Sequence, residues 1–292
     1  IAKPGAILAT NTSALNIDEI ASVTTRPEDV IGLHFFSPAN VMRLLEIVRA
    51  EKTADDVVAT SVDLARQIGK VATLVGVCPG FVGNRILFAR QYQANALVYE
   101  GIMPWDIDTA FNEFGFKMGP FQMSDLAGLD IGWKKGATTS NPIRDALCEL
   151  DRRGQKTGAG YYDYDENRKN VPSEVTAGII REITGAGDAT LSSEAIIDRC
   201  VIPMINEALA ILEENKAQRP SDIDVVWING YGWPLDKGGV MYYADILGAE
   251  KVLAVMTDLA ANDESIRVSP LLGELVSTGG RFVDIDTGGL KV

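Results

Sequence analysis

Short apolar segments alternate with polar, helix-forming segments over the first quarter of the chain. Apolar runs of strand length occur at residues 6–10, 30–33, 44–48 and 72–75. Between these runs, Asn16 precedes a segment with acidic residues in its first turn, and Thr53 opens a longer helical segment that stops at Gly69. The alternation predicts an α/β unit, but one with too few strands for a complete doubly wound sheet.

The pattern changes to helices from Cys78 onward. Apolar residues recur at helical spacing up to Gly101, and Pro104 begins another helix with Asp106 and Asp108 in its first turn. Residues 152–172 are rich in glycine, tyrosine and charge, which predicts an ordered connector with an extended segment at 161–164. The Gly158-Ala-Gly160 run lacks the strand and helix context of a nucleotide-binding loop, so we interpret it as an ordinary loop.

The helical pattern occurs twice. Motifs that begin at Asn84, Asn95, Asp106, Met118 and Asp125 correspond in order to motifs that begin at Asp198, Glu207, Asp222, Lys237 and Asp245. Small insertions change the offset between the copies, as expected for a divergent duplication, and the apolar face of one copy could cover that of the other. We therefore divide the chain into an α/β part at 1–77, a first helical repeat at 78–150, a connector at 151–190 and a second helical repeat at 191–292.

Composition narrows the classes of function. The 292 residues are 46% hydrophobic and carry a net charge of −13 with scattered basic residues, which argues against nucleic-acid binding. No segment has the roughly 20 consecutive apolar residues of a membrane span, so we expect no membrane association. Cys78, Cys148 and Cys200 are too widely spaced to suggest a metal site and are expected to be free thiols.

His34 is the only histidine, and Glu46 stands within an otherwise aliphatic run. Histidine is the side chain most easily poised to move protons near neutral pH, and burying a carboxylate is costly unless it is paired. The two residues therefore predict an ion pair with a catalytic role. The alternative is a structural histidine and a glutamate that faces solvent.

Three polar positions follow strands or begin a helix. They are Asn11-Thr-Ser13 after the first strand, His34 after the second, and Asn84 at the start of the helical part. Since active sites of open α/β sheets form at the carboxyl ends of strands, these residues are candidates for one site. The alternative is that Ser13 or Asn16, and likewise Asn84, only cap helices.

Taken together, the motifs resemble the 3-hydroxyacyl-CoA dehydrogenase family, and most closely its multifunctional members that also carry an enoyl-CoA hydratase. The resemblance extends over essentially the whole chain. Its motifs are Asn11-Thr-Ser13, His34-Phe-Phe-Ser-Pro-Ala39 with Val41, Met42 and Glu46, Pro79-Gly-Phe-Val-Gly-Asn-Arg85, Met118-Gly-Pro120 with Asp125, Gln155-Lys-Thr-Gly-Ala-Gly-Tyr161, and Gly230-Tyr-Gly-Trp-Pro234 with Lys237-Gly-Gly239.

The resemblance implies the C-terminal half of a Rossmann-like NAD-binding domain followed by two tandem helical repeats. It implies NAD-dependent oxidation of L-3-hydroxyacyl-CoA to 3-ketoacyl-CoA in fatty-acid β-oxidation. His34 then corresponds to the general base and Glu46 to the carboxylate that orients it. Ser13 and Asn84 correspond to groups that hydrogen-bond the substrate, and Asn11, Ser13 and Ser37 correspond to positions near the nicotinamide of NAD.

Some features depart from the family pattern. The glycine-rich pyrophosphate loop is absent from these 292 residues, so we expect the chain alone to bind NAD weakly and to be inactive. The second repeat has Asp198 where the first has Asn84, and Asn229 where some bacterial relatives have a substrate-contacting tyrosine. That repeat therefore looks structural in its chemistry, and the alternative is that it helps to shape the acyl pocket.

Other expectations concern assembly, location and alternative functions. The duplication suggests a monomer, because a tandem pair can bury within one chain the surface through which single-repeat relatives dimerise. Leu290-Lys-Val292 is not a peroxisomal Ser-Lys-Leu signal, so we expect a cytoplasmic protein. A non-catalytic helical scaffold is the alternative function, and a metal hydrolase is disfavoured because a lone histidine makes a poor metal site. Contact between His34 and Glu46, at a cleft beside the first repeat, distinguishes the enzyme from the scaffold.

Overall fold

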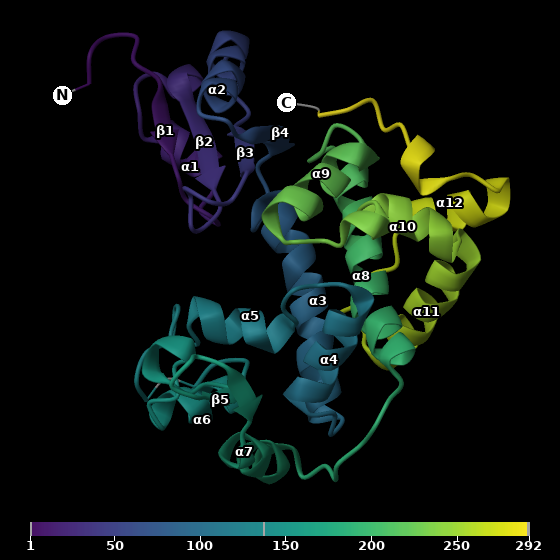
Figure 1. Cartoon of the computed structure of the whole chain (residues 1–292). Coiled ribbons are helices and arrows are strands. Elements are labelled where there is room, and N and C mark those ends of the chain that lie inside the picture. The colour runs from purple at the N-terminus through teal and green to yellow at the C-terminus, as the bar shows by residue number, and fades with distance from the viewer. Residues whose placement is uncertain (1, 137, 291–292) are drawn as a thin grey trace. The chain divides into compact units, whose positions relative to one another are not determined.

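The computed structural model describes residues 2–136 and 138–290, which form two compact units (Figure 1). Of the described residues, one unit comprises 2–89 and 202–290, and the other comprises 90–136 and 138–201. Most of the second helical repeat therefore belongs to the same unit as the sheet, although the first repeat and the connector lie between them in sequence. The four sequence segments remain our proposal for the ancestry of the chain.

The first unit contains a four-stranded mixed sheet. Its strands follow chain order: β1 (Leu8–Thr10), β2 (Val30–Phe35), β3 (Leu44–Arg49) and β4 (Val71–Gly76). β1 is parallel to β2, β2 is antiparallel to β3, and β3 is parallel to β4. All four predicted strands are present, and their ends differ from the prediction by at most two residues, because apolar runs of this length mark buried strands well.

The two faces of the sheet have different partners. On one face Leu33, Leu45 and Ile47 pack against α2 (Asp55–Gln67) in a buried cluster. Since side chains alternate along a strand, His34 and Glu46 point to the opposite face. That face receives α9 (Pro220–Gly230), which contacts β3 and β4.

Helices make up most of the remaining chain. α1 (Ile17–Ser22) begins after the N-cap Asn16, whose carboxamide accepts the N–H of Asp18, so this predicted cap is confirmed. α3 (Phe81–Tyr99) and α8 (Ser193–Glu213) each contribute to both units. The second unit also contains α4 (Pro104–Phe114), α5 (Pro120–Ala127), α6 (Pro142–Glu149), α7 (Glu174–Thr184) and the hairpin of β5 (Tyr162–Tyr164) and β6 (Asn170–Pro172). The first unit continues with α10 (Val240–Leu247), α11 (Ala249–Asn262) and α12 (Pro270–Thr278). The chain also forms short 3-10 helices, which are η1 (Pro27–Asp29), η2 (Gln155–Thr157), η3 (Leu235–Lys237) and η4 (Phe282–Asp284).

Equivalent aspartates reveal the duplication in three dimensions. Asp108 accepts the backbone N–H groups of Phe121 and Gln122 at the start of α5, at 3.0 and 2.8 Å. Asp224 accepts the N–H of Met241 at 2.7 Å and that of the next residue, at the start of α10. The sequence placed Asp108 in the first turn of its own helix, but its carboxylate instead satisfies the free N–H groups of the following helix.

A glycine precedes the capped helix in each copy for a steric reason. A Cβ atom at Gly119 would lie 2.2 Å from the Asp108 carboxylate, and one at Gly239 would lie 2.4 Å from that of Asp224. The aspartate and the glycine are therefore needed together. This shared arrangement supports the tandem helical repeats expected from the sequence.

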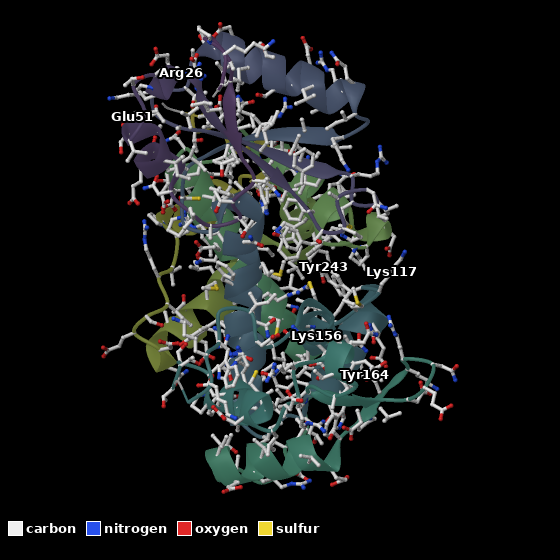
Figure 2. All side chains as sticks on the ribbon, turned by 90° about the vertical axis from the view of Figure 1, so that its left-hand side faces the viewer. Arg26, Glu51, Lys117, Lys156, Tyr164 and Tyr243 are labelled. Atoms are coloured by element: carbon white, nitrogen blue, oxygen red, sulfur yellow. The ribbon has the colours of Figure 1, made fainter. Side chains whose placement is uncertain are left out.

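A second pair of aspartates follows the same plan. Asp125 accepts the N–H groups of Tyr161 and Tyr162 at 2.9 and 3.0 Å, and the hydroxyl of Tyr164, labelled in Figure 2, at 3.0 Å. Asp245 accepts the N–H of Phe282 at 2.7 Å. In each copy this aspartate binds a segment that follows in the sequence, the start of β5 in the first copy and the start of η4 in the second.

The described residues show two further features. None of their helices combines the length and apolarity that crossing a membrane requires. The three cysteines are free and buried, and burial raises the pKa of the Cys200 thiol to about 12.

Candidate active site

A tight turn brings α3 to the face of the sheet that carries His34 and Glu46. Pro79 and Gly80 occupy the middle of this turn, Gly80 has a φ of +76°, and the N–H of Phe81 donates to the carbonyl of Cys78 at 3.0 Å. This is the pattern of a type II turn, which favours proline followed by glycine. Phe81 itself has a φ of +53°, a conformation that is costly for a bulky residue and is held here by complete burial.

His34 and Glu46 form the centre of the site. They oppose each other in the antiparallel register of β2 and β3, and His34 Nδ1 lies 2.7 Å from Glu46 Oε2. His34 is 5% exposed and Glu46 is fully buried. A carboxylate can only accept, so Nδ1 carries the proton and Nε2 presents its lone pair as a base. The contact expected from the sequence is present, although His34 lies within β2 rather than after it.

The other carboxylate oxygen of Glu46 is bound by the first turn of α3. The backbone N–H of Gly83 donates to Glu46 Oε1 at 2.9 Å. Gly83 is near the N-terminus of the helix, where backbone N–H groups lack intrahelical acceptors and the helix dipole favours negative charge. The buried charge of Glu46 is therefore balanced from two sides, by the histidine ring and by the helix.

Aromatic rings enclose the histidine. The ring centroid of Phe36 lies 4.5 Å from that of His34, and the centroid of Phe81 lies 5.7 Å away. These contacts fix the plane of the imidazole and limit the access of water.

Asn84 links two distant parts of the chain. Its Nδ2 donates to the backbone carbonyl of Ser13 at 3.3 Å, and its Oδ1 accepts the hydroxyl hydrogen of Tyr231 at 2.8 Å. Asn84 is inside the first turn of α3 rather than at its N-cap, so the capping alternative does not describe it. Ser13 joins the site through its carbonyl group, while its exposed side chain keeps its predicted substrate role as a proposal.

The predicted nicotinamide positions lie beside the ends of β1 and β2. Asn11 Oδ1 accepts the N–H of Phe35 at 2.9 Å, which joins the two strand ends. Ser37 is exposed two residues later. Lys70 donates to the carbonyl groups of Ala39 and Met42, the latter at 2.6 Å, and thereby holds the segment that follows Ser37.

Arg85 anchors the start of α3 to α8. It donates to both carboxylate oxygens of Glu214, at 2.6 and 2.8 Å, and its Nε donates to Glu207 at 2.5 Å. The hydrogen bonds with Glu214 raise the pKa of Arg85 above its already high ordinary value, so the guanidinium is charged. Arg85 thus fixes the turn of helix that carries Gly83 and Asn84.

Three contributions were missed by sequence reasoning: the backbone N–H of Gly83, the hydroxyl of Tyr231, and the anchoring by Arg85. Each residue stands within a motif on which the family resemblance was based, but a motif does not reveal which backbone group or distant side chain it contacts. Among the described residues, no three His, Cys, Asp or Glu side chains form a group that could hold a metal ion.

Comparison with known families decides the relationship. The 3-hydroxyacyl-CoA dehydrogenase NAD-binding domain matches residues 1–78, and the C-terminal domain of the same family matches residues 80–164 and again 196–282. The chain belongs to the 3-hydroxyacyl-CoA dehydrogenase family. The two matches to the C-terminal domain agree with the duplication found in the sequence.

Individual relatives include bifunctional enzymes and subunits of a fatty acid oxidation complex. The chain is 46% identical over 278 residues to the peroxisomal bifunctional enzyme of Cavia porcellus, covering 87% of this chain and 38% of that protein. It is 32% identical to the fatty acid oxidation complex subunit alpha of a Psychrobacter strain, covering 97% of this chain and 41% of that protein. The chain thus spans about two fifths of the length of these relatives.

Solved structures share the fold. The dehydrogenase part of multifunctional enzyme 1 from C. elegans is 32% identical, with a TM-score of 0.66 over 94% of this chain and 66% of that one. The 3-hydroxybutyryl-CoA dehydrogenase of Escherichia coli has a TM-score of 0.75 at 24% identity, covering 94% of this chain and 76% of that one, and shows likeness of fold.

The comparisons also correct one expectation. A cytoplasmic location was expected, but the relatives with 45–46% identity are peroxisomal enzymes, and so is a relative from rice. The expectation was wrong because it used the end of this sequence as evidence of an address. That segment includes residues 291 and 292, which lie outside the described residues.

Proposed function

We propose that this chain is the dehydrogenase portion of a multifunctional, peroxisomal type of enzyme that oxidises L-3-hydroxyacyl-CoA to 3-ketoacyl-CoA. The observation that carries the proposal is the buried His34–Glu46 pair, which leaves Nε2 of His34 as a base. A scaffold would have no need to bury a carboxylate against a histidine, because burying a charge is costly unless it serves a function.

The residues present divide the chemistry as follows. His34 Nε2 takes the proton of the 3-hydroxyl group, and Glu46 stabilises the resulting imidazolium. Asn84 Nδ2 has two N–H groups, of which one binds the Ser13 carbonyl, and the other donates to an oxygen of the substrate. The oxygen gains double-bond character as its proton leaves, and a fixed donor holds it in place.

The predicted cofactor positions suit the carboxamide at the nicotinamide end of NAD. The carboxamide oxygen of Asn11 accepts the N–H of Phe35, so the Nδ2 of Asn11 is the end that can donate to a ligand. The side chains of Ser13 and Ser37 are exposed. Such neutral donors suit an amide group rather than a phosphate. NAD supplies the acceptor for the hydride that leaves C3 of the substrate.

The test uses the natural full-length protein with acetoacetyl-CoA and NADH, followed by the loss of NADH absorbance. Turnover that depends on His34 supports the proposal. Turnover that is absent from the full-length protein, or that is unchanged in His34→Ala, contradicts it, because a positioned base contributes about 10²- to 10⁴-fold.

The behaviour of the 292 residues alone is a separate proposal. We propose that they bind NAD weakly and do not turn over substrate by themselves, since they contain no Gly-x-Gly-x-x-Gly loop. NADH titration followed by its fluorescence checks this, with the full-length protein as the comparison. Equal affinity in the two proteins would contradict it.

A further inference from the structure

Tyr231 holds one end of the Asn84 carboxamide. The phenol hydroxyl lies 2.8 Å from Asn84 Oδ1, while the other end of the carboxamide faces the Ser13 carbonyl. A backbone carbonyl can only accept, so the NH₂ end of Asn84 must face Ser13, and the oxygen must face Tyr231. The chemistry of the two partners, taken together, permits this orientation of the amide and disfavours the flipped one.

The ring of Tyr231 is itself held firmly. It follows the end of α9, stacks on Trp227 with centroids 4.5 Å apart, and meets Phe36 edge-on with centroids 5.3 Å apart. Gly83 allows the close approach, because a Cβ atom there would lie 2.6 Å from the Tyr231 ring. The hydroxyl is thus presented to Asn84 from a rigid support.

We propose that Tyr231 is a positioning residue of the dehydrogenase reaction, through which the second helical repeat takes part in the chemistry. It fixes Asn84 so that one N–H group is directed to the reacting oxygen. The inference rests on the proposed function, in which Asn84 binds the substrate. It goes beyond the expectation that the second repeat is structural in its chemistry.

The variant Tyr231→Phe removes the hydroxyl and keeps the ring with its stacking contacts. We expect kcat in the full-length protein to fall about 3- to 10-fold with a smaller change in KM, because the lost hydrogen bond orients a donor that matters most in the transition state. Tyr242→Phe is the matched control, since Tyr242 is exposed, stands in the same repeat, and uses only its backbone N–H to bind Asp224. That control should retain wild-type kcat.

A double-mutant cycle separates positioning from general support. In an Asn84→Ala background the hydroxyl has no carboxamide to orient, so adding Tyr231→Phe should change kcat less than twofold. A wild-type kcat in Tyr231→Phe, or an equal loss in both backgrounds, overturns the inference. Failure of the proposed function itself would appear differently, as absence of turnover in the unmodified full-length protein.

Discussion

Nδ1 of His34 and Oε2 of Glu46, which are twelve positions apart in sequence, lie 2.7 Å from each other on neighbouring antiparallel strands. The second oxygen of Glu46 accepts the N–H of Gly83 at 2.9 Å. Glu46 therefore meets a donor at each oxygen. Only a side chain that accepts at both of its ends, as a carboxylate does, can satisfy both donors.

Glu46→Gln should impair catalysis because a carboxamide has one accepting end and one donating end. If the oxygen faces His34, the NH₂ group opposes the N–H of Gly83; if the amide flips, His34 must accept at Nδ1, and its Nε2 is then protonated and cannot act as a base. We expect kcat in the full-length protein to fall at least about tenfold and by less than in His34→Ala. Glu51→Gln, which changes an exposed glutamate labelled in Figure 2, is the control and should match the wild type.

Gly83→Ala should destabilise the protein, although alanine is the better helix former. The added Cβ atom would lie 2.6 Å from the Tyr231 ring, so that ring must move. We expect the free energy of unfolding to fall by about 1 to 3 kcal/mol. In α12, Gly273 has open space around its Cα atom, and Gly273→Ala should stabilise by about 0.5 to 1 kcal/mol. Urea unfolding measures both, and a shift of the two variants in the same direction would refute the steric argument.

Arg85→Lys should weaken the anchor between α3 and α8. A lysine cannot reproduce the two parallel hydrogen bonds that Arg85 makes with Glu214, and the site is only 16% exposed. We expect a loss of about 1 to 3 kcal/mol in the free energy of unfolding. Arg66→Lys, at an exposed pair with Asp63, should change it by less than about 0.5 kcal/mol. Equal effects of the two substitutions would show that the geometry at Arg85 contributes nothing.

Asp108 and Asp224 should make the folded state more stable at lower pH. Burial raises the pKa of each carboxyl group to about 6, whereas aspartate in an unfolded chain titrates near pH 4. The folded state therefore binds these protons more tightly, and their contribution is present below about pH 4 and is lost as the pH rises through about 6. Between pH 5 and 7, Asp224→Asn should show a smaller loss of stability with pH than the wild type. Asp258→Asn, at an exposed position, should follow the wild-type slope.

A monomer is the assembly expected from the tandem repeats. Light scattering at low micromolar concentration should give the mass of one full-length chain. A dimer mass that persists on dilution would show that the duplication does not replace subunit pairing.

The sequence predicted the sheet well because its strands are short apolar runs bounded by polar residues. It also predicted the His34–Glu46 contact, since each residue would be costly alone in a buried strand. The tie between Tyr231 and Asn84 could not be predicted, because 147 residues separate them and no local pattern encodes that distance. The same holds for Asp108, which the sequence placed in the first turn of its own helix, while its carboxylate binds the start of the next one.

The edge of the sheet at β4 is covered by the segment that joins α8 to α9. The N–H of Gly76 donates to the carbonyl of Lys216 at 2.9 Å, and Val75 pairs with Ala217 in an antiparallel bridge. Exposed strand edges invite pairing with other molecules and aggregation. The second repeat thus also protects the β4 edge from pairing with other molecules. A variant that lacks this repeat would expose the edge and should aggregate unless another segment covers it.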